Sequence, residues 1–183
     1  MKTIRYGSVC SGVEAASLAW QPLGWEPAFF AEVEPFPCAV LQQRFNATKP
    51  MRLLDPLEKG IDLKEVKTRF AWCKQIEKLP ANGTIPNFGD FTKIRKEDFN
   101  GNIDLLVGGT PCQDLSVAGK RAGFDGQRSS LALDFVRLAY ELGAKWFVWE
   151  NVPGVFSSNG GGRFRNPFIP LYRNRSWNPP TGL

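Results

Sequence analysis

The sequence predicts an α/β fold built around a mostly parallel sheet. Short apolar strand patterns alternate with helical patterns along most of the 183 residues, which is the order of βαβ units. The run "NIDLLVGG", residues 102–109, is almost continuously apolar and ends in glycines, as expected for a strand buried on both faces of a parallel sheet. A chain of this length supports one domain with a substantial core.

Two strand–helix pairs make up the first part of the chain. Residues 3–10 and 25–34 have strand patterns, and residues 11–20 and 35–45 follow them with helical patterns. The prolines of the second helix fall in its first turn, where proline is tolerated.

An insertion of about residues 48–86 follows the second helix. We expect it to contain a helix that begins at Asp62, with Glu65 completing a capping box. The apolar stripe of this helix is expected to pack rather than to form a site, and it consists of Leu63, Val66, Phe70 and Cys73.

The second part of the chain continues the alternation. A third strand is expected near residues 87–94, a fourth at 102–109 and a fifth within 144–154. Between the last two strands, residues 129–143 have the helical period, with Gly143 as a cap. The apolar face of this helix consists of Leu131, Phe135, Leu138 and Leu142, and the charged face of Asp134, Arg137 and Glu141.

Charge and cysteine content narrow the class of protein. The net charge is +5, and four arginines without an acid in residues 156–183 supply most of it. This basic tail is either solvated or in contact with phosphate. The four cysteines form no CxxC pair, and the sequence has no apolar run or apolar leader of the kind that spans or enters a membrane. We therefore expect reduced thiols, no metal, no membrane partner and a cytoplasmic location.

Polar clusters follow each of the five predicted strands. Because ligands bind beyond the carboxyl ends of parallel strands, we expect these clusters to form one site. The residues are Cys10, Ser11 and Gly12 after the first strand, Glu32 after the second, Asp90 at the third, Cys112 after the fourth and Glu150 at the fifth. Glu32 suits the two hydroxyls of a ribose, although a solvated or helix-capping carboxylate explains both Glu32 and Asp90 equally well.

Cys112 lies on a polar loop near Lys120, Arg121 and Arg128. Packing is the commoner role of a cysteine, but cationic surroundings lower the pKa of a thiol. The chain has no histidine, and a thiol with a pKa of about 8.5 is already a few per cent thiolate at neutral pH. A protonated Glu150 opposite this thiol could donate to a ring nitrogen and make a neighbouring carbon electrophilic.

These motifs, in this order, resemble the cytosine-5 DNA methyltransferase family over roughly residues 3–158. "GGTPCQDLSVAGKR" resembles the catalytic Pro-Cys-Gln loop and "WENVPG" the Glu-Asn-Val motif. "SVCSGVEAA", "AEVEPFPCAVL" and "GDFTKI" are similar to the cofactor-binding motifs, with Ser8 and Cys10 where an acid and an aromatic are commoner. The resemblance implies a Rossmann-like, S-adenosylmethionine-dependent methyltransferase fold that is incomplete at the C-terminus.

The resemblance also implies a reaction and a role for each matching residue. A methyl group would pass from S-adenosylmethionine to C5 of a cytosine flipped out of double-stranded DNA, through a covalent bond between Cys112 and C6. Glu150 would hold N3 and Asn151 would orient that edge of the base. The implied cofactor residues are Cys10, Ser11, Gly12, Glu32, Val33, Asp90, Phe91, Pro111 and Leu131. The implied DNA-contacting residues are Gln113, Ser116 and Arg128.

The pattern departs from the family after Asn151. Only 32 residues follow, and from 159 onward they are rich in Arg, Asn, Pro and aromatic residues. We therefore expect a cofactor-binding and catalytic domain over residues 1–158, an irregular basic tail over 159–183, no target recognition domain and impaired activity. We also expect exposed apolar surface beside the fifth strand.

Four alternatives to an active cytosine-5 DNA methyltransferase stay open. The first is a non-catalytic S-adenosylmethionine-binding fragment. The second is one half of a split bacterial or phage methyltransferase that a second chain completes. An RNA cytosine is a third alternative and a thiol-dependent redox role a fourth.

Overall fold

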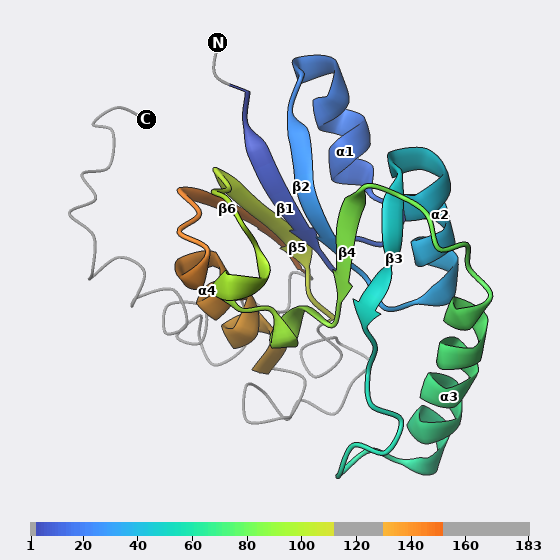
Figure 1. Cartoon of the computed structure of the whole chain (residues 1–183). Helices are drawn as coiled ribbons and strands as arrows, with labels where there is room; N and C mark the ends of the chain where they lie inside the picture. The colour runs from blue at the N-terminus through green and yellow to red at the C-terminus, as the bar shows by residue number, and fades with distance from the viewer. Residues whose placement is uncertain (1–2, 112–129, 152–183) are drawn as a thin grey trace.

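The computed structural model describes residues 3–111 and 130–151. Within them, a single six-stranded sheet has the strand order β3-β4-β2-β1-β5-β6 (Figure 1). Every pair of neighbouring strands is parallel. The strands are β1 (Arg5–Val9), β2 (Glu26–Ala31), β3 (Ala47–Arg52), β4 (Ile85–Gly89), β5 (Leu105–Gly109) and β6 (Trp146–Glu150). The predicted α/β class with a parallel sheet is confirmed.

Helices connect the strands as crossovers. The α-helices are α1 (Ala15–Trp20), α2 (Pro35–Phe45), α3 (Leu63–Glu77) and α4 (Ser130–Glu141), and the short 3-10 helices are η1 (Gln21–Leu23), η2 (Phe91–Lys93) and η3 (Lys96–Asp98). Figure 1 shows α3 at the periphery, beyond the β3 edge of the sheet.

The core lies on both faces of the sheet, as the alternation of β2 requires. Phe29 packs with Leu106 of β5 and Phe135 of α4 on one face. Its neighbour Phe30 packs with Leu41 of α2 on the other face. Two adjacent residues of one strand therefore anchor α4 and α2 to opposite faces.

Helix α4 follows the predicted pattern. Phe135 and Leu138 are completely buried. On the charged face, Arg137 forms ion pairs with Asp134 and Glu141, at 3.3 and 2.9 Å. Gly143 ends the segment with a positive φ of 67°, the left-handed conformation that glycine adopts at helix ends.

Strand β3 was not predicted, because its sequence "ATKPMR" has a lysine and a proline where strands favour β-branched residues. It pairs with β4 at the edge of the described sheet, and an edge is where a strand tolerates proline. The insertion of residues 48–86 therefore begins inside the sheet. The third predicted strand is also displaced, since β4 ends at Gly89 and residues 91–93 form η2.

Helix α3 begins as predicted but packs differently. The Asp62 carboxylate accepts a hydrogen bond from the Glu65 backbone N–H at 2.7 Å, while the Glu65 carboxylate pairs with Arg69 at 2.9 Å instead of returning to Asp62. The packing prediction for the stripe is wrong at Leu63 and Phe70, which are 78% and 45% exposed.

Strand β6 lies at the other edge of the described sheet. Its side chains Trp146 and Val148 are 61% and 44% exposed, in agreement with the apolar surface expected beside the fifth predicted strand. In the part of the chain that the structure describes, no helix combines the length and apolar character that a membrane crossing needs.

Candidate functional site

The carboxyl ends of all the strands meet at one edge of the sheet, because every strand is parallel to its neighbours (Figure 1). Cys10 follows β1, Glu32 follows β2 and Asp90 follows β4. Thr110 and Pro111 follow β5, and Glu150 is the last residue of β6. The structure thus brings the described candidates to a single rim, as the sequence predicted.

The loop after β1 is open above its glycine. Cys10 and Gly12 both have left-handed backbone conformations, with φ of 49° and 54°. A Cβ built on Gly12 would have no neighbouring atom within 4 Å, so a ligand can approach this backbone closely. The Cys10 N–H donates to the Ala31 carbonyl at 2.8 Å and ties the loop to the end of β2.

The Cys10 thiol is not a nucleophile in this environment. Burial, together with the charges of Glu32 and Asp90, raises its pKa to about 12. A thiol with such a pKa is neutral at physiological pH. Cys10 therefore contributes its backbone and its bulk to this loop.

Glu32 is buried, and its carboxylate organises the two loops around it. One oxygen, Oε2, accepts a hydrogen bond from the Gly12 N–H at 2.8 Å. The other, Oε1, accepts from the N–H groups of Val33 and Glu34 at 2.7 and 2.9 Å. Because a carboxylate oxygen can accept two hydrogen bonds, Oε2 retains capacity for one more. The carboxylate is thus a loop brace that can also receive a ligand hydroxyl.

Asp90 caps the short helix η2. Its Oδ1 accepts from both the backbone N–H and the hydroxyl of Thr92, at 3.0 and 2.7 Å. The Asp90 N–H donates to the Arg52 carbonyl at 2.8 Å, so the unpredicted strand β3 supports this turn. Phe91 is buried in the core on the α4 face, whereas Val33 is partly exposed.

The ends of β5 and β6 are joined by two side chains that flank Glu150. The Trp149 indole N–H donates to the Thr110 hydroxyl at 3.0 Å, and the Asn151 amide donates to the Thr110 carbonyl at 3.2 Å. Gly109 lies opposite Glu150 in the ladder, and a Cβ there would sit 2.7 Å from Glu150 Oε2. The exposed Glu150 carboxylate therefore lies beside the chain segment that leads into Cys112.

The structure describes only some of the remaining predicted residues. Cys112, Gln113, Ser116 and Arg128 lie outside the described residues. Pro111 is exposed. Leu131 is partly buried against the same core cluster as Cys10. Ser11 donates its hydroxyl to the Ser8 carbonyl at 2.9 Å and so stabilises the loop after β1.

Several supporting residues were missed by sequence reasoning. Glu14 is buried below the loop after β1, and Asn87 is buried between the ends of β2 and β4. Thr110 and Trp149 join β5 to β6. A strongly polar residue inside an apolar pattern was the available signal for Glu14 and Asn87. Among the described residues, no cluster of three His, Cys, Asp or Glu side chains is arranged to hold a metal ion.

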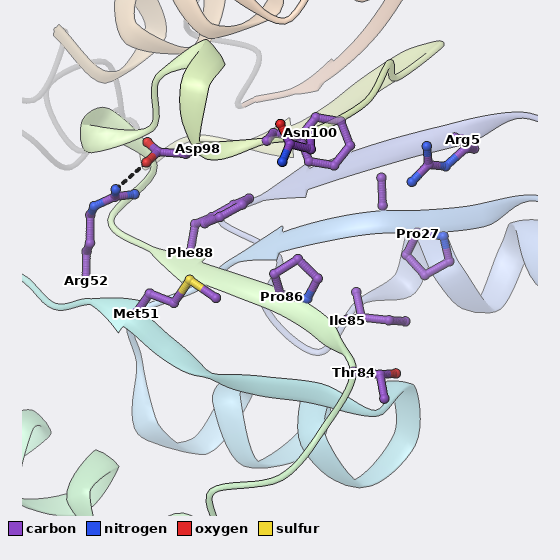
Figure 2. Close-up of a pocket in the computed structure, with 12 residues that line it drawn as sticks. Arg5, Pro27, Met51, Arg52, Thr84, Ile85, Pro86, Phe88, Asp98 and Asn100 are labelled. Carbon is purple, nitrogen blue, oxygen red and sulfur yellow. Dashed lines mark hydrogen bonds and ion pairs between the residues drawn. The ribbon is translucent and has the colours of Figure 1, made fainter.

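A groove of about 700 Å³ lies along the sheet rather than at this rim (Figure 2). It runs over β2 and β4, and the Arg52–Asp98 ion pair closes one end at 2.6 Å. None of the predicted site residues lines it. The strand ends remain the candidate site, because ligands bind beyond the carboxyl ends of parallel strands and the carboxylate that lines the groove, Asp98, is paired with Arg52.

Comparisons with known proteins agree with this geometry. Residues 63–169 match the family model described as C-5 cytosine-specific DNA methylase. A protein of Escherichia phage P1 named DNA N-6-adenine-methyltransferase is 41% identical over 170 residues, which cover 86% of this chain and 18% of that protein. The orphan methyltransferase M.SPRI of Bacillus phage SPR is 47% identical over 75 residues, or 41% of this chain and 17% of that protein.

Solved structures extend the similarity to the fold. A protein described as a DNA modification methyltransferase encoded within an E. coli prophage has 18% sequence identity and a TM-score of 0.58. The superposition covers 93% of this chain and 38% of that one. The chain therefore has a methyltransferase fold and spans less than a fifth of the length of the two phage relatives.

Proposed function

The chain belongs to the C-5 cytosine-specific DNA methylase family, and from this premise we propose that it carries the cofactor-binding and catalytic motifs of a DNA cytosine-5 methyltransferase. The methyl donor is S-adenosylmethionine and the acceptor is C5 of a cytosine flipped out of double-stranded DNA. The connection of β5 to β6 carries this proposal. It sets the Glu150 carboxylate beside Gly109, which is three residues before Cys112 in the sequence.

The described residues fit S-adenosylmethionine. The open backbone at Gly12 admits a ligand to the loop after β1, and Glu32 Oε2 has capacity for a ribose hydroxyl. In this proposal Cys10, Ser11 and Gly12 line the cofactor, Val33, Asp90 and Phe91 lie at its adenine, and Pro111 and Leu131 lie at its methionine end. When bound, the cofactor supplies an electrophilic methyl group.

The protein's part in the reaction is to activate the cytosine. The Cys112 thiolate forms a bond to C6 while Glu150 holds the proton at N3, so that the electron pair moves toward C5. After C5 gains the methyl group, a base removes the C5 proton and the sulfur leaves. Asn151 keeps the end of β6 on the Thr110 carbonyl and thereby fixes Glu150. Gln113, Ser116 and Arg128 contact the DNA.

A trapping experiment tests this mechanism. Duplex DNA that contains 5-fluorocytosine, incubated with the chain and S-adenosylmethionine, is expected to form a complex that survives denaturing electrophoresis, because fluorine cannot leave C5 as a proton does. The Cys112→Ser variant should lose the complex and Cys73→Ser should keep it. Cofactor binding without any complex would contradict the proposal in favour of a non-catalytic binding fragment. A complex that forms only after a second chain is added would identify a split enzyme.

The base that receives the methyl group is a separate question, because the phage P1 relative is named for adenine. We propose cytosine, since the Pro-Cys-Gln and Glu-Asn-Val motifs supply a nucleophile and an acid that transfer to an exocyclic amine does not need. Tritiated cofactor followed by digestion of the DNA to nucleosides should place the label in 5-methylcytosine. Label in N6-methyladenine, or in RNA offered as competitor, would overturn this choice. We expect the reaction in the cytoplasm of a bacterial host.

A further inference from the structure

Asn87 occupies a completely buried position where β2 and β4 meet. The two strands are joined in the ladder at one register pair, Phe30 with Asn87. Beyond that pair, the Asn87 side chain continues the connection in place of backbone hydrogen bonds. Asn87 therefore lies where the two chain segments that carry Glu32 and Asp90 separate from each other.

The Asn87 amide oxygen serves both turns at once. It accepts hydrogen bonds from the backbone N–H of Glu32 and of Gly89, each at 3.0 Å. Glu32 is the proposed ribose ligand. Gly89 directly precedes Asp90 and has a left-handed backbone conformation, with a φ of 78°. A single oxygen atom thus fixes the start of the turn that carries each acidic residue.

Neighbouring groups hold the Asn87 amide in this orientation. Its nitrogen lies 3.6 Å from Cys38 Sγ, and the Cys38 thiol donates to the Glu32 carbonyl at 3.3 Å. The Asn87 backbone N–H donates to the Thr48 hydroxyl of β3 at 2.9 Å. Backbone, amide oxygen and amide nitrogen are therefore all engaged, and the side chain has one well-determined position.

We propose that Asn87 is the positioning residue of the cofactor site, which sets the location of Glu32 relative to Asp90 so that the Glu32 carboxylate meets the ribose hydroxyls. The inference rests on the proposed cofactor site and adds to it a residue that touches no ligand. Replacing Asn87 with alanine removes the acceptor from two buried N–H groups and releases both turns.

The test compares two ligands by calorimetry, S-adenosylhomocysteine and its analogue without the 2′ and 3′ hydroxyls. In the unmodified chain the analogue is expected to bind about tenfold more weakly, because it cannot donate to Glu32. In Asn87→Ala this ratio should fall below about threefold. In Leu41→Ala, which opens a cavity in the core beside Phe30 but removes no hydrogen-bond partner of Asn87 or Glu32, the ratio should remain that of the unmodified chain.

Two further measurements keep the outcome decisive. Asn87→Asp presents an oxygen to the same two N–H groups, so it should keep the ratio, and it decides the matter if Asn87→Ala does not fold. Without ligand, the Glu32 and Gly89 amides should exchange hydrogen about tenfold faster in Asn87→Ala than in Leu41→Ala. An unchanged ratio in Asn87→Ala, or a lost one in Asn87→Asp, would overturn the inference. Failure of the unmodified chain to bind either ligand would instead refute the cofactor site.

Discussion

A buried carboxylate, Glu14, organises the loop that the cofactor is proposed to touch. It is 1% exposed and has a left-handed backbone with φ of 66°. Its oxygens accept from the Ser8 hydroxyl at 2.7 Å and from the N–H and hydroxyl of Ser17 at 3.0 and 2.9 Å. Burial raises the pKa of Glu14, and the hydrogen bonds from Ser8 and Ser17 oppose that rise.

The raised pKa makes a prediction about stability and pH. A carboxyl group whose pKa is higher in the folded state binds a proton more readily when folded, so the free energy of unfolding should decrease as pH rises above about 4.5. Glu14→Gln cannot ionise and should flatten this decrease, as measured by urea unfolding between pH 4 and 8. Glu14→Ala should lose about 1–3 kcal/mol through unsatisfied donors. An equally steep decrease in Glu14→Gln would argue against this role.

Two glycines of the site should respond differently to alanine. A Cβ on Gly89 would lie 1.8 Å from the Arg52 carbonyl oxygen, at a φ of 78°, so Gly89→Ala should cost on the order of 3 kcal/mol of unfolding free energy. Gly12→Ala meets no atom within 4 Å and should cost about 1 kcal/mol from its positive φ. It should nevertheless weaken S-adenosylhomocysteine binding. Equal losses of stability in urea titrations would show that the two turns do not differ in the space available for a Cβ.

Cysteine reactivity provides a third prediction at this scale. Burial raises the pKa of both Cys10 and Cys38 to about 12, so at pH 8 only about one thiol in ten thousand is ionised at either position. Iodoacetamide followed by peptide mass spectrometry should label Cys112 well before these two, because the basic neighbours of Cys112 in the sequence favour its thiolate. Earlier labelling of Cys10 than of Cys112 would contradict the assignment of the nucleophile.

Among the elements, α4 shows that the period of apolar residues in the sequence can predict the buried face of a helix. Its apolar face was predicted, and Phe135 and Leu138 are fully buried. Strand β3 could not be predicted, because its pairing with β4 rather than its own propensity makes it a strand. Helix α3 shows the opposite case, in which two residues of a periodic apolar stripe, Leu63 and Phe70, stay largely exposed.

The packing of α4 leads to a prediction with an internal control. Leu138→Ala removes a completely buried side chain between α4 and the sheet and should lower the free energy of unfolding by about 2–5 kcal/mol. Leu133→Ala on the same helix removes a side chain that is 49% exposed and should change it by less than about 1 kcal/mol. Denaturant unfolding of both variants decides whether the buried face of α4 stabilises the fold.

At the scale of the whole molecule, the parallel sheet explains why the residues of the candidate rim could be predicted. Strand ends that are far apart in sequence meet at one rim, so a list of strand-end residues already named Glu32, Asp90 and Glu150. The residues that hold these strand ends in place could not be predicted. Asn87 and Trp149 act through partners on neighbouring strands, and a partner set by strand order leaves no spacing signal in the sequence.

The binding of S-adenosylhomocysteine, followed by titration calorimetry, tests the central claim that this rim is a methyl-donor site. We expect saturable binding to one site, weakened at least about tenfold in Glu32→Ala. Glu26→Ala, an exposed glutamate at the opposite end of the same strand, should bind like the unmodified chain. No binding by the unmodified chain, or equal binding by the Glu32→Ala and Glu26→Ala variants, would show that this rim is not the methyl-donor site.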